Sequence, residues 1–490
     1  MIVMVGDNDA GAYATYTQAG QTYGSSLLWT LILLIPVLYV CQEMVARLGA
    51  VTGVGHARLI FERFGKFWGA FSVIDLFLLN ALTIVTEFIG ISLAMDYFGL
   101  PKALGVLVAA GLTMAAVSTG SFRRFERFAV LLCLGSLVVV PIFLVAHPSV
   151  GTMARDMALP RLPAGKLSDV MLLVIGIVGT TVAPWQLFFQ QSYVVDKRLK
   201  PRFMSYERGD MALGVVFTQV GAIAMLAFAA AAFAGKPEFG NFTDAGGVAA
   251  GLAKYVGRWA GDLFAIGLID AALLGAAAVG LSTSYALGDV LTLRHSLHRK
   301  PTDALGFYAS YGVVIALSAA LVLLPGAPLG LLTEAVQVLA GVLLPSATVF
   351  LLLLCNDKAV LGPWVNNGWQ NLLTGIIVAV LVVLSLVLTA AVVFPDLSDR
   401  QILGIMAFGG VLGAGAFGVS RLFSPRTLDT VERDNPTPNR ETWRMPSLDR
   451  LPPPRLSLTT RLWMVALRAY LVVAVALVVL RVVQLAMGQG

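Results

Sequence analysis

Charged residues are scarce in this chain. Only 13% of its 490 residues are Asp, Glu, Lys or Arg, while 58% are hydrophobic, and the mean hydropathy is +0.82. A typical soluble domain carries about twice that charged fraction. Runs of roughly 20 apolar residues recur from end to end, each long enough to cross a bilayer as a helix. The composition predicts an all-α polytopic membrane protein in a lipid bilayer, with no separate soluble domain and no cleavable signal peptide.

Cysteine and histidine offer little reactive chemistry. The three cysteines, Cys41, Cys133 and Cys355, lie within apolar runs and have no CxxC partner, which is typical of packing residues. The four histidines fall at span ends or in loops. There is no HExxH motif, no pair of metal-ligand histidines and no nucleophile elbow. We therefore expect neither an enzyme nor a bound cofactor.

Thirteen candidate membrane spans can be placed along the chain. They are roughly 1–21 (broken), 24–46, 67–96, 103–119, 127–146, 168–193 (broken), 209–234, 259–290, 306–324, 331–354, 370–394, 402–420 and 463–486. We divide the chain into a first repeat (1–150), a second repeat (165–356), accessory spans (368–422), a Pro- and Arg-rich, mostly unstructured cytoplasmic linker (423–460) and a C-terminal span (461–490).

The distribution of basic residues predicts the orientation. Of the 34 Lys and Arg residues, 24 fall in the connections that follow even-numbered spans and only eight in those that follow odd-numbered spans. Basic loops stay in the cytoplasm. We therefore expect a multi-pass protein of the cell membrane with its N-terminus inside. Because the basic residues follow the loops, the net charge of +6 does not indicate nucleic-acid binding.

The segment Val5-Gly6-Asp7-Asn8-Asp9-Ala10-Gly11-Ala12 places two carboxylates and an amide within the first apolar span. Acidic groups inside a membrane are rare unless they pair, line water or bind a cation. No Lys or Arg is close in sequence, so a cation that binds and leaves is the first hypothesis.

A second interruption lies in the sixth span, where Pro184 removes a backbone donor in the middle of an apolar run. The two breaks are five spans apart, so the second enters the membrane from the opposite side. This is the pattern of two inverted five-helix repeats with a binding site at the midplane. Pro36, Pro141 and Pro345 are consistent with simple kinks.

Several segments resemble one known family. Asp9-Ala10-Gly11-Ala12-Tyr13-Ala14-Thr15, followed by Gln18-Ala19-Gly20, is similar to the first-helix signature of NRAMP divalent-metal transporters, which reads Asp-Pro-Gly-Asn with a similar tail. Val182-Ala183-Pro184-Trp185 falls where that family has Met-Pro-His. Segments 42–53, 337–345, 356–358 and 365–367 also resemble it. The resemblance covers residues 1–394 and implies a leucine-transporter-type 5+5 inverted repeat, with about three further C-terminal spans.

The departures from the family pattern point to the transported ion. Asp9 keeps the metal-binding aspartate, but Ala12 replaces the asparagine ligand, Ala183 the methionine and Trp185 the histidine. Without the soft thioether, and with more room, the site suits a partly hydrated Mg²⁺ or Mn²⁺. This is similar to the NRAMP-related magnesium transporter branch. Glu87 matches a family glutamate, whereas Ile84 stands where the family has an aspartate linked to proton coupling, so uncoupled transport is expected.

The candidate site residues have different expected roles. Asp9 is the main charged ligand, and Asp7 and Asn8 either bind the metal through water or wet the entrance. The carbonyls near Gly6 and Thr180 match family positions that face the metal, and Ala183 leaves space. Thr181, Gln186, Gln190 and Gln337 either contact the ion's hydration shell or pack between helices. Glu87 is either a pathway carboxylate or a neutral structural acid. Trp185 is a gate or packing element, and Ala12 lines the pathway.

Other functions remain open. Alternatives are a proton-coupled Mn²⁺ or Fe²⁺ transporter of the same family, and a sodium-coupled symporter for an organic solute. Asp7 and Asp9 would repel an anionic solute, and metal flux unaffected by sodium would favour the metal transporter. A membrane enzyme or a non-transporting scaffold is a further alternative. The oligomeric state is not predicted. Because so few residues precede the first break, we expect either residues upstream of Met1 or a truncated first half-helix.

Overall fold

The computed structural model of the protein describes residues 1–326, 329–394, 397–422, 439–454, 464–465, 467–473 and 476. No strand occurs in these ranges, and long helices dominate them. The prediction of an all-α membrane protein is confirmed. Of the predicted last span, 463–486, the structure describes 464–465, 467–473 and 476, and these residues are helical.

The helices follow the apolar runs of the sequence. Those of the first half are α1 (Ile2–Val5), α2 (Ala10–Tyr23), α3 (Leu28–Thr52), α4 (His56–Phe64), α5 (Lys66–Tyr97), α6 (Lys102–Val117), α7 (Phe122–Gly135), α8 (Val139–Ala146) and α9 (Val150–Ala158). Those of the second half are α10 (Leu167–Thr181), α11 (Pro184–Asp196), α12 (Met204–Phe233), α13 (Ala245–Tyr255), α14 (Arg258–Val290), α15 (Leu305–Leu323), α16 (Leu329–Cys355), α17 (Lys358–Leu361), α18 (Gly368–Val393) and α19 (Asp399–Leu422). Short 3₁₀ turns are η1 (Gly24–Leu27), η2 (Ser136–Val138), η3 (Pro201–Phe203), η4 (Gly362–Trp364) and η5 (Leu448–Arg450).

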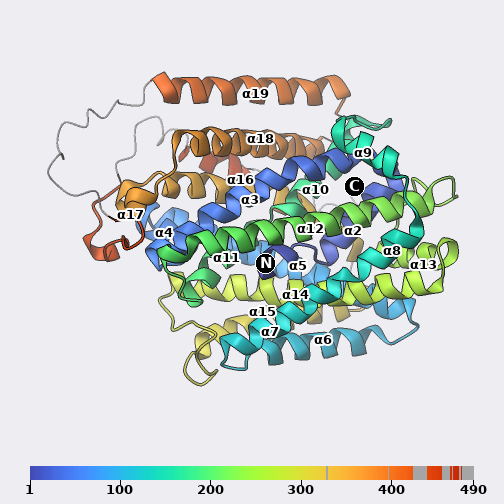
Figure 1. Ribbon diagram of the computed structural model, residues 1–490, viewed down its shortest axis with the longest axis horizontal. Helices are drawn as coiled ribbons and strands as arrows, with labels where there is room; N and C mark the ends of the chain where they lie inside the picture. Colours follow the sequence, from blue (N-terminus) through green and yellow to red (C-terminus); the bar gives the residue numbers. More distant parts are fainter. Residues whose placement is uncertain are drawn as a thin grey trace.

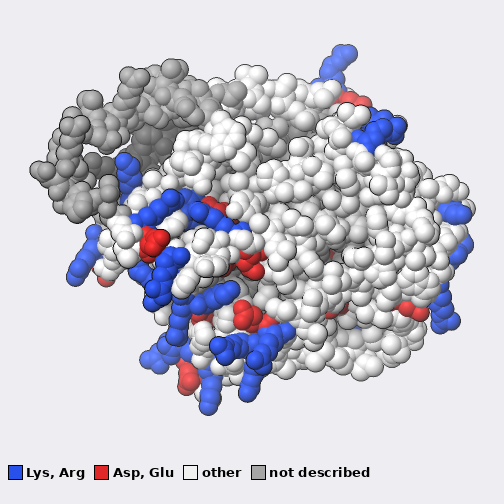
Figure 2. Space-filling view, in the orientation of Figure 1, with Lys and Arg blue, Asp and Glu red and all other residues white. Residues whose placement is uncertain are grey.

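Most long helices run along the long axis of the molecule (Figure 1). Lys and Arg gather toward its ends and leave a broad band between them that is almost free of charge (Figure 2). Within the described ranges, eight helices are long and apolar enough to cross a membrane, or nine if the bent pair Leu343–Cys355 and Lys358–Trp364 counts as one span. This arrangement is that of a multi-pass membrane protein.

Fewer helices meet the length and composition of a span than the thirteen runs suggest. The stretch Ala10–Thr52 is one candidate span of 43 residues, although two spans were predicted within it. The helix Lys102–Val117 is apolar but is shorter than a full membrane span. Three short helices, α4, α9 and α13, lie in segments predicted as connections. Each packs against a longer helix, α4 on α5, α9 on α3 and α13 on α14. A short one-sided pattern is hard to distinguish from a loop in sequence alone.

The two broken spans lie inside the bundle. α2 packs along α12, and α5 packs along α14, the longest helix. α10 contacts α2, α16 and α3, while α11 contacts α3 and α14. The breaks between α1 and α2 and between α10 and α11 are therefore enclosed by other helices, which is where irregular backbone at membrane depth is tolerated.

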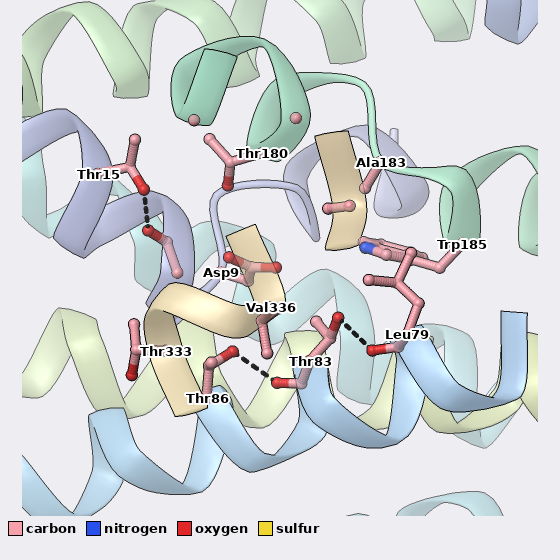
Figure 3. Close-up of a pocket in the computed structure, with 14 residues that line it drawn as sticks. Asp9, Thr15, Leu79, Thr83, Thr86, Thr180, Ala183, Trp185, Thr333 and Val336 are labelled. Atoms are coloured by element: carbon pink, nitrogen blue, oxygen red, sulfur yellow. Dashed lines mark hydrogen bonds between the residues drawn. The ribbon is translucent and has the colours of Figure 1, made fainter. Parts of the chain in front are cut away.

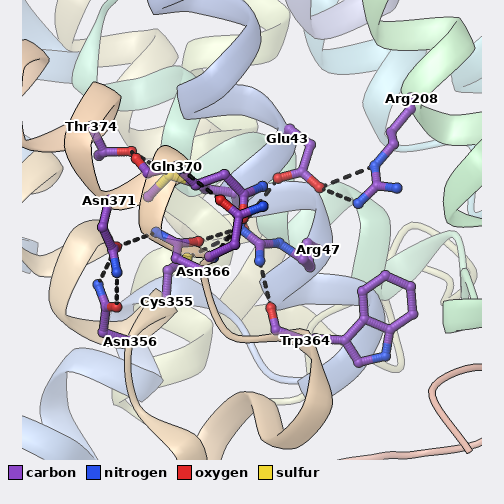
Figure 4. Close-up of polar contacts among 12 residues, drawn as sticks. Glu43, Arg47, Arg208, Cys355, Asn356, Trp364, Asn366, Gln370, Asn371 and Thr374 are labelled. Carbon is purple, nitrogen blue, oxygen red and sulfur yellow. Dashed lines mark hydrogen bonds and ion pairs between the residues drawn. The ribbon is translucent and has the colours of Figure 1, made fainter. Parts of the chain in front are cut away.

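One end of the bundle is tied by a buried polar network made of Glu43, Arg47, Arg208, Trp364 and Asn366, here called the α3 network (Figure 4). Glu43 pairs with Arg47 at 3.2 Å and with Arg208 at 2.7 Å. Arg47 also donates to the Trp364 carbonyl and to Asn366 Oδ1. The Glu43–Arg47 pair lies within α3, and the other links join α3 to α12 and to the α17–α18 connection, so the network fixes both against α3.

Residues 439–454 belong to the segment predicted as an unstructured linker, and the structure shows them docked on this end. The Trp364 indole N–H donates to the Arg440 carbonyl at 2.7 Å, and Arg63 donates to the Pro452 carbonyl at 2.6 Å. Gly362 has φ +50°, and a Cβ there would fall 2.3 Å from Trp443. Composition alone does not reveal this docking, because its anchors are scattered single residues.

Candidate metal site

The first break unwinds the chain over Gly6–Asp9, between the four-residue α1 and α2. Asp9 is the N-cap of α2, and its Oδ1 accepts the Ala12 N–H at 2.9 Å. An aspartate is favoured here because its side chain satisfies an otherwise unpaired helix N–H. Glycine at position 11 leaves space beside the Asp9 carboxylate, since a Cβ there would fall 3.2 Å from Asp9 Oδ1.

A second carboxylate reaches the same helix start from α5. Glu87 is fully buried, and its Oε2 accepts the Ala10 N–H at 3.1 Å. The partial positive charge of a helix N-terminus stabilises nearby anions. Asp9 and Glu87 thus both lie at the start of α2, and neither forms an ion pair with a described Lys or Arg. Glu87 supports the backbone beside Asp9.

Asp7 has no such backbone partner, and the side chain that faces its carboxylate is that of Gln186. It is fully buried, and neither of its carboxylate oxygens has a hydrogen-bond partner among the described atoms. Gln186 Nε2, on α11, is also buried and unpartnered, while its Oε1 accepts from Gln42 at 3.1 Å. Buried polar groups are nearly always hydrogen-bonded, so unpaired ones indicate an unseen water or ion.

The second break is formed by Val182 and Ala183. Ala183 is extended, with φ −76° and ψ 141°, and Pro184 begins α11 at the position where its missing N–H costs least. Thr181 closes α10 by donating to the Ile177 carbonyl at 2.6 Å, and its oxygen also bonds the Tyr16 hydroxyl at 2.8 Å. Thr181 therefore joins α10 to α2.

A pocket of about 50 Å³ lies where α2, α5, α10 and α16 meet the two breaks (Figure 3). Its lining residues are Asp9, Gly11, Thr15, Leu79, Thr83, Thr86, Gly176, Gly179, Thr180, Ala183, Trp185, Thr333, Val336 and Ala340. Asp9 is the one charged side chain among these, and no Met, Cys or His is among them. One bound water needs about 10–15 Å³ of such space, so the pocket holds several.

Threonine hydroxyls cover much of the pocket wall. Thr83 donates to the Leu79 carbonyl at 2.9 Å, and Thr86 donates to the Thr83 carbonyl at 2.7 Å. Because each hydroxyl proton is committed to the backbone, each oxygen presents lone pairs. Those lone pairs can accept hydrogen bonds from water around a cation.

The structure gathers some of the predicted site residues and separates others. Asp9, Thr180, Ala183 and Trp185 line the pocket. Gly6 lies just behind it, where a Cβ would come 3.6 Å from the Trp185 ring. Seven other predicted residues do not line the pocket: Asp7, Asn8, Ala12, Glu87, Thr181, Gln186 and Gln190.

Three of those residues have well-defined other partners. Asn8 turns toward α12, where its Nδ2 donates to the Thr218 carbonyl at 3.0 Å. Gln190 Nε2 donates to Glu207 Oε1 at 3.4 Å, away from the pocket. Ala12 contributes its backbone N–H to Asp9. Gln337 lies on α16, but its side chain is outside the part that the structure describes.

Thr83 and Thr86 are pocket residues that the sequence reasoning missed. They are one helical turn apart in Thr83-Ile84-Val85-Thr86-Glu87, and they precede the glutamate that had been singled out. Two hydroxyls at i and i+3 share a helix face. This spacing beside an intramembrane acid was the available signal, but threonine pairs are common in apolar helices.

The ligand set suits a hard ion that keeps water. Among the described residues, no group of three or more His, Cys, Asp or Glu side chains is placed to hold a metal. The lining of the pocket instead includes one carboxylate and several threonine side chains. Mg²⁺ and Mn²⁺ accept such oxygen ligands, and Mg²⁺ usually retains several waters.

Sequence comparisons identify relatives over most of the chain. The family described as natural resistance-associated macrophage protein-like (Nramp) matches residues 1–391. A divalent metal cation transporter MntH from Aeromonas hydrophila is 26% identical over 418 residues, covering 80% of this chain and 94% of that protein. The MntH of Pectobacterium carotovorum is 26% identical over 291 residues, covering 56% of this chain and 66% of that protein.

Solved structures show the same fold. A manganese transporter from Eremococcus coleocola superposes with a TM-score of 0.65 at 20% identity, covering 86% of this chain and 92% of that one. A nucleobase-cation-symport-1 family transporter gives a TM-score of 0.51 at 13% identity, with the same coverage of this chain and 93% of that one. These likenesses confirm the predicted leucine-transporter-type architecture.

Proposed function

This chain belongs to the Nramp family, and from that membership we propose that it moves the divalent cations Mg²⁺ and Mn²⁺ across a membrane by alternating access. Its relatives are named as transporters, and the metal is cargo, so no resident cofactor is required. The ion binds at Asp9, between the two helix breaks.

One observation carries the proposal. Asp9 is the one charged group in a pocket whose described lining holds threonines and small residues and no sulfur or imidazole. Soft ligands favour late transition metals, whereas carboxylate and water favour Mg²⁺ and Mn²⁺. The preference for magnesium rests on Ala183, which removes the side chain that supplies a thioether in the resembling family.

We also propose that transport is not coupled to protons. Trp185 and Ile84 stand where the family pattern has a histidine and an aspartate, and both side chains here are buried and apolar. Transport then follows the electrochemical gradient of the metal. The runner-up is proton-coupled Mn²⁺ uptake, which the names of the relatives favour.

Proteoliposome uptake tests this proposal. Purified protein is reconstituted with an internal Mg²⁺ dye and, in parallel, an internal pH dye, and Mn²⁺ is assayed in the same way. Wild type should take up both metals without acidifying the lumen. Asp9→Ala should take up neither metal, and the exposed control Asp303→Ala should behave as wild type. Acidification that accompanies metal entry supports the runner-up instead.

A substitution at the second break tests selectivity. Ala183→Met adds a thioether beside Asp9 and fills part of the pocket. We expect Cd²⁺ uptake to rise and Mg²⁺ uptake to fall, because a soft ligand favours the softer ion. Leu187→Met, fully buried one turn further along α11, is the matched control that leaves the ratio unchanged. An unchanged ratio in Ala183→Met would place the ion elsewhere.

We propose that the N-terminus faces the cytoplasm of a cell membrane. The three native cysteines are buried, so a single introduced cysteine reports sidedness. In intact cells, an impermeant thiol reagent should label Lys236→Cys and spare Lys300→Cys, since both side chains are exposed but lie in connections of opposite side. The reverse pattern would invert the topology.

A further inference from the structure

Residues 439–454, here called the strap, cross one end of the bundle beside α4 and α17 (Figure 1). The strap is irregular apart from the turn η5, yet it hydrogen-bonds to helices far away in the sequence. The Met445 N–H donates to the Val51 carbonyl near the end of α3 at 3.3 Å. Arg63 of α4 donates to the Pro452 carbonyl at 2.6 Å. The strap therefore joins the end of α3 to α4.

The strap also contacts the α17–α18 connection. The Trp364 indole N–H donates to the Arg440 carbonyl at 2.7 Å, and the Arg440 guanidinium lies 4.2 Å from the centroid of the Trp364 ring. Gly362 has φ +50°, and a Cβ there would fall 2.3 Å from the ring of Trp443. A glycine is needed for the indole of the strap to come this close. One short segment thus ties three separate elements together.

The end of α3 is closely packed on α11, the helix that begins at the second break. A Cβ at Gly49 of α3 would fall 2.8 Å from the Gln191 carbonyl of α11. Gln191 Nε2 donates to the Val54 carbonyl at 2.8 Å, and Gln191 Oε1 lies 2.8 Å from His56 Nδ1. The last turn of α3, the α3–α4 junction and α11 therefore form one packed unit, here called the junction unit. The first turn of α11 carries Trp185, which lines the metal pocket.

The strap acts beyond the point at which the α3 network fixes α3. Arg47 of that network is buried, and Val51, which the strap contacts, lies one turn further along the helix. Contacts made by buried groups open at a high free energy, whereas contacts made by exposed and half-exposed segments open more easily. Trp443 is half-buried, and Arg440 is exposed. The α3 network is therefore a fixed point, and the strap is a releasable tie on the junction unit.

We propose that the strap is an autoinhibitory contact, which holds the junction unit against the α17–α18 connection and must undock before the metal pocket opens toward this end of the bundle. The inference rests on the proposed alternating-access transport. In such a cycle, helices at one end separate from their neighbours, and a contact that bridges them favours the closed state. The free energy of undocking adds to the barrier for transport. A weaker strap therefore raises the rate and leaves the ligands of the ion unchanged.

Mg²⁺ uptake into proteoliposomes tests the proposal with strap variants. Trp443→Ala should raise the maximal uptake rate about fivefold, the effect of one lost contact on the docking equilibrium, and should leave the KM for Mg²⁺ unchanged. Trp369→Ala removes an exposed indole outside the strap and should transport as wild type does. Arg440→Ala removes only the cation stacked on Trp364 and should raise the rate about threefold. It replaces Trp443→Ala if that variant does not fold.

Thiol labelling measures docking of the strap independently of transport. The three native cysteines are buried, so Met445→Cys introduces the reactive thiol. Because the Met445 side chain packs against the hydrophobic core, the introduced thiol should react slowly in the otherwise wild-type protein and faster when combined with Trp443→Ala. Ser447→Cys, at an exposed position of the strap, is the control and should react rapidly in both backgrounds.

Three results would contradict the proposal in different ways. Faster labelling of Met445→Cys without faster uptake in Trp443→Ala would make the strap purely structural and overturn the inference alone. Labelling of Met445→Cys as fast as that of Ser447→Cys in the wild-type background would show that the strap is not docked, and it also overturns the inference alone. Absence of Mg²⁺ and Mn²⁺ uptake by wild type overturns the proposed function, and the inference with it.

Discussion

Two regions of this molecule bury acidic side chains in opposite ways. In the α3 network, Glu43 contacts Arg47 and Arg208, and Arg47 has two further acceptors (Figure 4). At the first helix break, Asp7 is as deeply buried but has no hydrogen-bond partner among the described atoms. A buried charge with partners fixes helices, and a buried charge without them is ready for a ligand.

The largest stability effect is expected on the paired side of this comparison. Glu43→Gln should lower the free energy of unfolding by about 3 kcal/mol, because removing one partner leaves a buried, uncompensated Arg47. Thermal melting in detergent measures the change, and Glu441→Gln, an exposed acid, is the control. A melting temperature equal to that of wild type would mean that the network does not hold α3.

The opposite sign is expected at the break. Asp7→Asn should raise the free energy of unfolding by about 2 kcal/mol in the absence of divalent ions, because it removes an unsatisfied buried charge. The same melting assay, run in chelator, compares it with Glu43→Gln. Destabilisation by both substitutions would erase the distinction between the two regions.

The docked segment 439–454 packs on the same end of the bundle as the α3 network. Trp443→Ala should lower the free energy of unfolding by about 1.5 kcal/mol, since a half-buried indole packed on Gly362 is lost. Trp369→Ala removes an exposed indole from the start of α18 and serves as the control. Equal melting of the two variants would show that the segment adds nothing to stability.

The smallest effect concerns the pocket wall. Thr86→Val keeps the shape but removes an oxygen that faces the pocket, so the KM for Mg²⁺ should rise about fivefold, or about 1 kcal/mol. Thr113→Val in α6 removes a hydroxyl with the same backbone bond but far from the pocket. A KM that stays at the wild-type value in Thr86→Val would remove the threonines from the ion's hydration shell.

The sequence predicted both helix breaks because glycine, acidic residues and proline interrupt apolar runs there. It also predicted Asp9, Thr180, Ala183 and Trp185, which line the pocket. The helices and their order follow from the same runs, since the bilayer imposes length and backbone pairing.

Other features depend on helix rotation and on contacts between distant segments. Asn8 and Asp9 are neighbours in sequence, yet the turn of the backbone sends them into different cavities. Asp270 meets Gly135, 135 positions away, only after folding. The docking of Trp443 on Gly362 is a tertiary contact of the same kind. No local pattern encodes these pairings.

Calorimetric Mg²⁺ binding to the purified protein tests the central claim most directly. Wild type and Asp303→Ala should bind Mg²⁺. Folded Asp9→Ala should bind at least about 100-fold more weakly, since losing a residue that only hydrogen-bonds a metal ligand already costs about 10–100-fold in affinity. Equal Mg²⁺ affinity in Asp9→Ala and wild type would contradict the assignment of the pocket between the two breaks as the metal site.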